Sequence, residues 1–263
     1  MFLLLIAHTR KIKMLIDVAF TPAEIQANAT KVCIVIDVIR ATSSLTVIAS
    51  KKPDNIILTT TIGKASKIAS MGTSHPLLCG ERKGLPPEGF DFGNSPAEYF
   101  KADLKGKSIV FTSSNGTRAI AEVLMSPKVY LGCFLNGGAV AEKAYNYAVS
   151  HKLDILLVCA GREEKFAVDD AYCAGYLVSR IVSKITSEQE FSLGDGAQAS
   201  LGIFGYYRDD KRLMQMSGAG KQVIDIGLSE DLTFLLQRDL IDVVPELVSD
   251  DNSTVEYGFK VRV

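Results

Sequence analysis

Short runs of consecutive apolar residues alternate with helix-like segments along most of this 263-residue chain. The most apolar run, "LDILLVCAG" at residues 153–161, is typical of a strand that is buried on both faces. The alternation predicts strands at 31–38, 55–60, 107–113, 128–133 and 153–161, and helices at 42–50, 62–71, 116–125, 138–150 and 169–185. Because each of these strands is followed by a helix, we expect an α/β fold with a mostly parallel sheet covered by helices on both faces.

The two ends of the chain are less regular than its middle. They predict a strand at 14–20, a helix at 229–240 and a final strand at 255–263. We expect a single α/β unit over residues 14–263, with a weak subdivision near the polar segment 186–196, and an N-terminal extension over residues 1–13.

Two short motifs predict helix starts at Thr21 and Ser95. "TPAE" and "SPAE" each supply a capping hydroxyl, a proline at the first helical position and a glutamate at the third. The hydroxyl can accept a hydrogen bond from one of the free backbone N–H groups at the start of a helix.

Charge and composition favour a small-molecule partner. The net charge is −1 and the pI is about 6.3, whereas a protein that neutralises nucleic-acid phosphates usually carries a clear basic excess. The N-terminal "MFLLLIAH" is too short for a signal peptide or a membrane span, and five cysteines without a CxxC pair are typical of reduced core thiols. We therefore expect a cytoplasmic protein that binds neither nucleic acid nor a membrane.

Four polar loops are expected at the ends of strands. They are the Asp37 loop "DVIRATSS" (37–44), the Glu81 loop "GERKGLPPEGFDFGNSP" (80–96), the Asn115 loop "TSSNGT" (112–117) and the Asp170 loop "AGREEKFAVDD" (160–170). In open α/β sheets, ligands bind beyond the carboxyl ends of the strands. The sequence therefore predicts that these loops form one site.

Two of the loops carry groups that suit an anion. In the first, Asp37 ends a strand and the guanidinium of Arg40 can hold a pair of anionic oxygens. In the Asn115 loop, free N–H groups at a helix start favour negative charge. The alternatives are a structural carboxylate at Asp37, a surface position for Arg40 and ordinary capping by Ser114 or Asn115.

The Asp170 loop suggests a metal site. It gathers four carboxylates and two cations: Glu163, Glu164, Asp169, Asp170, Arg162 and Lys165. Mg²⁺ prefers oxygen ligands and often takes only one or two carboxylates together with water and substrate oxygens. Glu81 and Asp91 could supply further oxygens. The alternative is a set of solvated acids that the helix dipole favours.

Mechanisms based on histidine, on cysteine or on a P-loop are not supported. The histidines are His8, His75 and His151, all outside the four loops, and no cysteine is followed by the arginine of a thiol phosphatase loop. "SGAGKQ" (217–222) lacks the first glycine and the final serine or threonine of a P-loop. Arginines, hydroxyls, glycine-rich loops and carboxylates remain, a combination that favours phosphoryl transfer.

In this order and spacing, the four loops resemble those of the 2-phosphosulfolactate phosphatases of coenzyme M biosynthesis. The resemblance runs from about Met14 to the C-terminus. It implies a Mg²⁺-dependent hydrolase that converts 2-phosphosulfolactate to 3-sulfolactate and phosphate on an α/β fold specific to the family, and it is compatible with a homodimer. Asp169 stands where the family pattern has glutamate, and "REEKF" is more charged than that pattern.

The resemblance and the chemistry of the loops together suggest roles for individual residues. The predicted catalytic residues are Asp37, Arg40, Glu81 and Asp170. The predicted substrate contacts are Thr42, Ser43, Arg82, Asn94, Ser114, Asn115, Gly116, Thr117 and Arg162. The predicted metal ligands are Glu81, Asp91, Asp169 and Asp170.

In this hypothesis, Asp170 with Glu81 or Asp91 positions Mg²⁺, the arginines balance developing charge, and a carboxylate activates water. Lys83 and Glu88 are expected only to be solvated. Two alternatives stay open. One is a phosphatase for another small anionic phosphomonoester, such as phosphoglycolate or phospholactate, and the other is a non-catalytic anion-binding protein.

Overall fold

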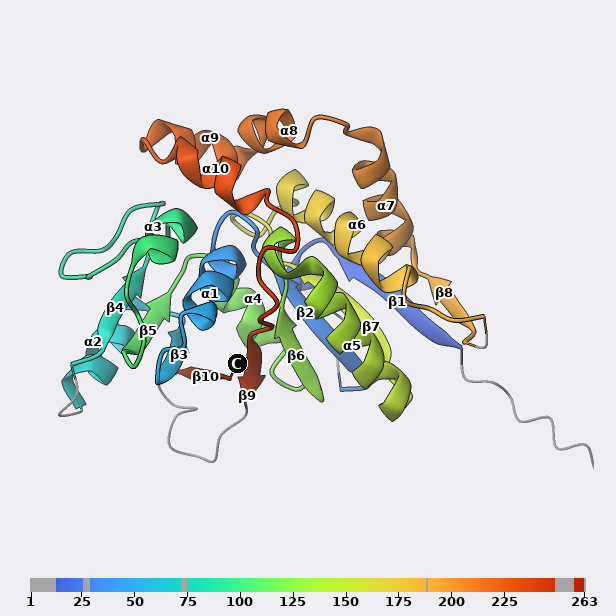
Figure 1. The fold of residues 1–263 in the computed structure, drawn as a ribbon, viewed down its shortest axis with the longest axis horizontal. Coiled ribbons are helices and arrows are strands. Elements are labelled where there is room, and N and C mark those ends of the chain that lie inside the picture. Colours follow the sequence, from blue (N-terminus) through green and yellow to red (C-terminus); the bar gives the residue numbers. More distant parts are fainter. Residues whose placement is uncertain (1–12, 26–28, 72–74, 188, 249–257, 263) are drawn as a thin grey trace, which may run out of the picture.

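The protein is described by a computed structural model that covers residues 13–25, 29–71, 75–187, 189–248 and 258–262 (Figure 1). Nearly all of the predicted N-terminal extension, residues 1–12, lies outside the described residues. The same holds for residues 255–257 and 263 of the last predicted strand.

The described residues form ten strands of one sheet, in the order β4-β5-β3-β10-β9-β6-β2-β7-β1-β8. The strands are β1 (Met14–Ala19), β2 (Lys31–Ile36), β3 (Asn55–Thr59), β4 (Leu77–Gly80), β5 (Ser108–Thr112), β6 (Lys128–Leu131), β7 (Asp154–Cys159), β8 (Phe191–Leu193), β9 (Glu246–Val248) and β10 (Phe259–Arg262). Every strand predicted from the apolar runs is therefore present.

Two parallel groups make up this sheet. Strands β4, β5 and β3 pair in parallel, and so do β6, β2, β7, β1 and β8. The C-terminal strands β9 and β10 join the groups, because β10 pairs antiparallel with β3 and β9, and β9 pairs antiparallel with β6. The predicted α/β fold with a mostly parallel sheet is confirmed.

Helices follow most strands and pack against the sheet (Figure 1). They are α1 (Ala41–Ser50), α2 (Ile62–Met71), α3 (Pro96–Lys101), α4 (Gly116–Glu122), α5 (Gly137–His151), α6 (Val168–Val182), α7 (Asp195–Tyr206), α8 (Asp210–Met216), α9 (Gly218–Asp225) and α10 (Ser229–Leu235), with 3-10 turns η1 (Pro22–Glu24) and η2 (Phe134–Asn136). The predicted helix at 229–240 ends early, at Leu235, because Asp239 and Ile241 donate backbone hydrogen bonds to η2.

One of the two predicted helix starts is confirmed. The Ser95 hydroxyl accepts a hydrogen bond from the Glu98 amide at 3.2 Å and caps α3. The helix predicted at Thr21 is wrong, since only the single turn η1 forms and Ile25 is already extended. The carboxylate of Glu24 bends back to the amide of Phe20 and closes this turn.

The helices α8, α9 and α10 form a helical cover, of which only α10 was predicted from the sequence, within the helix expected at 229–240. In Figure 1 it lies at the top of the molecule, above α1 and α3. Glycines such as Gly202 of the preceding helix α7 and Gly218 of α9 weaken the apolar periodicity by which a helix is recognised in a sequence. The helix α10 packs against α3, which places the cover over the end of the sheet.

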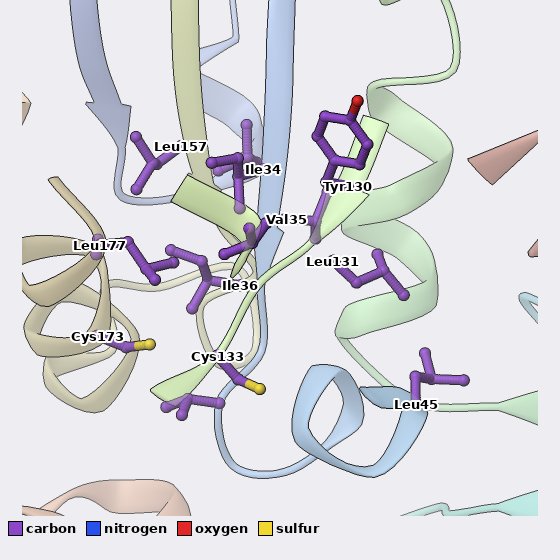
Figure 2. Packing of buried hydrophobic residues seen from close by; sticks show 14 of the residues in the cluster. Ile34, Val35, Ile36, Leu45, Tyr130, Leu131, Cys133, Leu157, Cys173 and Leu177 are labelled. Carbon is purple, nitrogen blue, oxygen red and sulfur yellow. The ribbon is translucent and has the colours of Figure 1, made fainter. Parts of the chain in front are cut away.

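The core lies between the sheet and these helices. Ile34, Val35 and Ile36 of β2 are fully buried, and Figure 2 shows them among apolar side chains such as Leu131 and Leu157. All five cysteines are free and buried, as predicted. Within the described part of the chain, no helix has the length and apolar character that crossing a bilayer demands.

Two helical glycines test the packing of α6 against α7. A Cβ at Gly175 would lie 2.1 Å from the Ser200 carbonyl oxygen, whereas a Cβ at Gly202 would have no heavy atom within 4 Å. We expect Gly175→Ala to lower the free energy of unfolding by about 1–3 kcal/mol through overpacking. Gly202→Ala, the matched control, should raise it by about 0.5–1 kcal/mol. Urea denaturation measures both, and equal effects would contradict this packing.

Candidate active site

The four predicted loops meet around one cavity of about 270 Å³. Residues of β2, β4, β5 and β7 carry the chain into these loops, so the cavity lies at the carboxyl ends of strands from both parallel groups. Its lining includes Asp37, Arg40, Glu81, Lys83, Asn94, Ser114, Asn115, Arg162, Glu163, Asp169 and Asp170. Residues Ala219, Gln222 and Val223 of α9 form a further wall.

The Asp37 loop turns sharply from β2 into α1. Asp37 Oδ1 accepts a hydrogen bond from the Ala41 amide at 3.3 Å, and a Cβ at Gly116 would lie 2.8 Å from Asp37 Oδ2. Glycine is therefore needed where the Asn115 loop approaches Asp37. The hydroxyls of Thr42 and Ser43, predicted as substrate contacts, donate to the carbonyls of Asp37 and Val38 and do not line the cavity.

Asp170 bridges the ends of two central strands. Its Oδ1 accepts a hydrogen bond from the Val38 amide at 2.9 Å, and its Oδ2 accepts one from the Gly161 amide at 3.0 Å. These amides follow β2 and β7, which pair in parallel. The adjacent Asp169 is also buried. Both acids occupy the first turn of α6, where the helix dipole favours negative charge.

Burial raises the pKa of three carboxyl groups in the cavity, and neighbouring charges add to this effect at Asp37 and Asp170. Burial, with repulsion from Glu81 and Asp169, raises the pKa of Asp37 to about 7. Burial also raises the pKa of Asp169 to about 6, although the Ser217 hydroxyl and Arg162 act in the opposite direction. For Asp170, burial and the charges of Asp169 and Asp37 raise the pKa well above its ordinary value. The cavity therefore concentrates negative charge that nothing in it fully neutralises.

Glu81 holds two loops together. Its Oε1 accepts a hydrogen bond from the Ser114 amide at 2.7 Å, and its Oε2 accepts one from the Gly84 amide at 2.8 Å. Arg82 and Asp91 point elsewhere. Arg82 donates to Thr112 Oγ1 and to backbone carbonyls, and Asp91 accepts from the Leu78 amide and lines a different hollow. The structure thus separates Asp91 from the other predicted metal ligands.

The Asn115 loop gives Ser114 and Asn115 to the cavity. The Asn115 side-chain oxygen accepts a hydrogen bond from the Glu163 amide at 3.4 Å and joins this loop to the Asp170 loop. Thr117 is fully buried, and its hydroxyl donates to the Ser113 carbonyl. Gly116 lets the Asn115 loop approach Asp37 closely, as described above. Thr117, which was predicted as a substrate contact, does not line the cavity.

Two tight turns of the same form face the cavity. Arg82 pairs with Leu85, and Arg162 pairs with Lys165, each through two backbone hydrogen bonds. In both turns the two central residues are left-handed, with φ of 53° and 84° at Lys83 and Gly84 and of 51° and 64° at Glu163 and Glu164. These turns place Lys83 and Glu163 in the cavity lining, and Lys83, expected only to be solvated, is exposed there.

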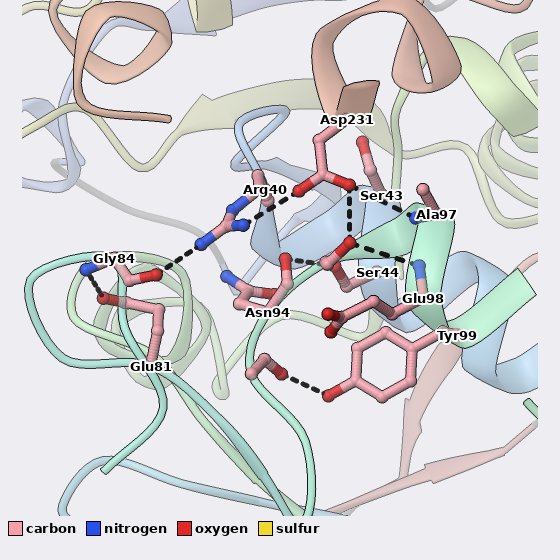
Figure 3. Close-up of polar contacts among 12 residues, drawn as sticks. Arg40, Ser43, Ser44, Glu81, Gly84, Asn94, Ala97, Glu98, Tyr99 and Asp231 are labelled. Carbon is pink, nitrogen blue, oxygen red and sulfur yellow. Dashed lines mark hydrogen bonds and ion pairs between the residues drawn. The ribbon is translucent and has the colours of Figure 1, made fainter. Parts of the chain in front are cut away.

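Three cations line the cavity, and only one is neutralised. Arg40 is buried and forms an ion pair with Asp231 of α10, with 2.9 Å between Nη1 and Oδ2 (Figure 3). In the described part of the chain, Lys83 and Arg162 have no salt bridge. Arg162 donates a long hydrogen bond of 3.5 Å to Gln222. Lys83 and Arg162 are therefore the cations available to an anionic ligand.

Sequence reasoning missed Asp231 and the α9 wall. Asp231 lies 191 positions from Arg40 and carries no motif. The segment "SGAGKQ" does lie beside the cavity, but as the capped start of α9 rather than as a P-loop. The Ser217 hydroxyl accepts a hydrogen bond from the Gly220 amide at 2.9 Å.

The donor set of the cavity fits a hard divalent cation. Asp37, Asp169 and Asp170 supply carboxylate oxygens; the charge of Asp169 raises the pKa of Asp37, and the charges of Asp169 and Asp37 raise that of Asp170, a repulsion that a cation relieves. Asn94 Oδ1 is buried and accepts no hydrogen bond from the described residues. Among those residues, no three acidic, histidine or cysteine side chains are already gathered as a metal cluster. The fit is thus to Mg²⁺ held by few carboxylates together with water and substrate oxygens.

Fold and cavity define a class of protein: an α/β protein with an acidic, polar site at the carboxyl ends of parallel strands. A family model described as 2-phosphosulpholactate phosphatase matches residues 19–250. The chain belongs to this family, whose members are phosphoric monoester hydrolases.

Three relatives are each named "Probable 2-phosphosulfolactate phosphatase". The one from Pseudothermotoga lettingae is 37% identical over 238 residues, covering 90% of this chain and 97% of the relative. Those from Clostridium perfringens and Clostridium acetobutylicum are 34% and 31% identical, covering 95% and 90% of this chain and 100% and 99% of the relatives. The resemblance stated from the four loops is confirmed.

The raised pKa of Asp37 predicts that the free energy of unfolding depends on pH. Its ordinary value is 3.8 and its value here is about 7, so the unfolded chain loses this proton first as pH rises. Stability of the metal-free protein should fall between about pH 4 and pH 7, on the order of 3–4 kcal/mol from this group. Asp37→Asn removes the ionisation and should therefore become progressively more stabilising, relative to the wild type, across this range.

Thermal unfolding in EDTA at several pH values checks this difference, with the exposed Glu88→Gln as control. A stability difference between Asp37→Asn and the wild type that does not change with pH would contradict the burial of an ionisable Asp37.

Proposed function

We propose that this protein hydrolyses the phosphate ester of 2-phosphosulfolactate to 3-sulfolactate and phosphate, with Mg²⁺ as cofactor. The observation that carries the proposal is the meeting of Asp37, Asp169 and Asp170 with Lys83 and Arg162 in one cavity. Membership of the phosphatase family and the names of the relatives support it. Phosphoryl transfer requires mainly positioning and charge neutralisation, which this set of groups can supply.

The carboxylates divide into two kinds. Asp37, Asp169 and Asp170 would hold Mg²⁺, with Asn94 Oδ1 able to accept a hydrogen bond from a water or a ligand. The bound metal would polarise the phosphoryl group and offset its negative charge. Glu81 differs in what its hydrogen bonds connect: its oxygens accept from the Gly84 and Ser114 amides of two loops, whereas those of Asp170 accept from amides just beyond two paired strands.

The substrate is a polyanion with phosphate, sulfonate and carboxylate groups on three carbons. Lys83 and Arg162 lie on facing turns of the cavity and would bind its anionic groups, together with the Ser114 and Asn115 region. Bound Mg²⁺ would keep Asp37 ionised, because a nearby cation favours the charged form of a carboxylate.

The alternatives differ from this proposal in substrate or in class. Another small anionic phosphomonoester, such as phosphoglycolate, would use the same metal and cations but lacks the sulfonate group. A non-catalytic anion binder gains nothing from three carboxylates beside its ligand, because they repel it. The place in coenzyme M synthesis, the cytoplasmic location and the homodimer stay predictions.

Asp170→Asn tests the role of the acidic cluster. We expect phosphate release from 2-phosphosulfolactate to fall by about 100-fold or more, because the metal loses a charged ligand. The control Glu88→Gln changes an exposed carboxylate of the Glu81 loop and should stay within about twofold of the wild type. In the wild type, EDTA should abolish release and added Mg²⁺ restore it. Activity of Asp170→Asn equal to that of the control would contradict the proposal.

Arg162→Gln tests substrate choice. The wild type should hydrolyse 2-phosphosulfolactate with at least about tenfold higher kcat/KM than phosphoglycolate or phospholactate, since each lost charge-assisted hydrogen bond costs about 1.5–3 kcal/mol. The variant should raise KM for 2-phosphosulfolactate and lose most of this preference. A preference unchanged in Arg162→Gln would assign the sulfonate contact to other residues, and no preference in the wild type would favour another phosphomonoester.

A further inference from the structure

The ion pair between Arg40 and Asp231 is the most buried in the described part of the chain. Both side chains are 2% exposed, and 2.9 Å separates Nη1 from Oδ2. Arg40 lies in the Asp37 loop and lines the cavity, whereas Asp231 belongs to α10 of the helical cover. Figure 3 shows the carboxylate of Asp231 above Arg40, with the guanidinium reaching from there toward Gly84.

Asp231 collects hydrogen bonds from two further positions. Its Oδ1 accepts from the Ser95 hydroxyl at 2.6 Å and from the Ala97 amide at 3.4 Å, both at the start of α3. One carboxylate thus connects α10, α3 and the Asp37 loop. Arg40 extends the connection, because its Nη2 donates to the Gly84 carbonyl at 2.7 Å in the turn that carries Lys83.

Such a network is a poor way to gain stability. Removing two charges from water costs free energy that their mutual attraction often fails to return, and a buried pair can often be replaced by apolar residues without loss. The pair stands at the wall of a cavity that also holds four buried carboxylates, those of Asp37, Glu81, Asp169 and Asp170. Its position therefore indicates a function in that cavity rather than in the core.

Asp231 sets both the direction and the charge of Arg40. A guanidinium has five N–H donors, and two of them are used by Asp231 and Gly84. These two hydrogen bonds hold the guanidinium of Arg40 in one orientation, and its other N–H groups stay available to a ligand in the cavity. The charge of Arg40 is balanced by Asp231, so net positive charge in the lining comes from Lys83 and Arg162.

We propose that Asp231 is a positioning residue for the reaction: it fixes the guanidinium of Arg40 at the cavity wall and cancels its charge. This inference rests on the proposed function, since it assumes that the cavity binds and hydrolyses a phosphate ester. It gives the helical cover a part in catalysis, because α10 carries the residue that orients a group from the opposite end of the chain.

Asp231→Asn separates the two effects. The amide keeps an oxygen that can accept from Ser95, but it leaves the charge of Arg40 unbalanced and its fork less firmly held. We expect kcat for 2-phosphosulfolactate to fall at least tenfold, while inorganic phosphate binds about fivefold more tightly in calorimetric titrations with Mg²⁺. A change in packing alone would instead lower kcat, phosphate affinity and the melting temperature together.

Glu230→Gln is the matched control. It removes the same charge from the neighbouring position of α10, but Glu230 is exposed and pairs only with exposed Lys101 at 3.4 Å. Its kcat and phosphate affinity should equal those of the wild type. If Asp231→Asn behaves like this control, or if it loses activity, phosphate affinity and thermal stability in parallel, the proposal is overturned.

Ser95→Ala keeps the inference testable if Asp231→Asn does not fold. It removes the 2.6 Å hydrogen bond to Asp231 and the cap of α3, but keeps both charges of the pair, and its melting temperature reports the loss of the cap. We expect kcat to fall about threefold with unchanged phosphate affinity, and an unchanged kcat would count against positioning. A wild type that releases no phosphate from 2-phosphosulfolactate would instead overturn the proposed function. The phosphate titration would still show whether Asp231 balances Arg40.

Discussion

Asp170 links the ends of the two strands at the centre of the site, and the rest of the cavity depends on this link. Its two oxygens accept hydrogen bonds from the amides of Val38 and Gly161, directly beyond β2 and β7. These strands pair in parallel, so Asp37 and the Asp170 loop leave the sheet side by side. One buried carboxylate therefore satisfies two backbone donors and lies close enough to Asp169 and Asp37 for their charges to raise its pKa.

A second set of contacts closes the cavity from above. Glu81 ties the Glu81 loop to the Asn115 loop, while Asp231 ties the helical cover to Arg40 and to the start of α3. The C-terminal strands β9 and β10 join the two parallel groups of strands on whose ends these loops stand. The last third of the chain thus contributes none of the four loops, but it supplies the α9 wall of the cavity and the charge of Asp231.

The electrostatic character of the cavity follows from this arrangement. Four buried acids, Asp37, Glu81, Asp169 and Asp170, face two cations without salt bridges, and the third cation is neutralised by Asp231. A polyanionic ligand would be repelled by the acids alone, whereas a divalent cation would relieve their repulsion and attract it. Family membership and the chemistry of the cavity therefore support the same reaction class from independent observations.

The sequence by itself determined the α/β class, the strands, most helices and the four loops, because apolar runs and capping motifs are local signals. It also placed Asp37, Asp169 and Asp170 at one edge of the sheet, since the loops that follow parallel strands meet there. Only the tertiary structure decided that Asp91 faces the Leu78 amide, that the hydroxyls of Thr42 and Ser43 bond within their own loop, and that Lys83 reaches the cavity. The partnership of Arg40 with Asp231 joins positions far apart in the chain, and such a contact leaves no pattern in a single sequence because it arises only when the cover packs onto the sheet.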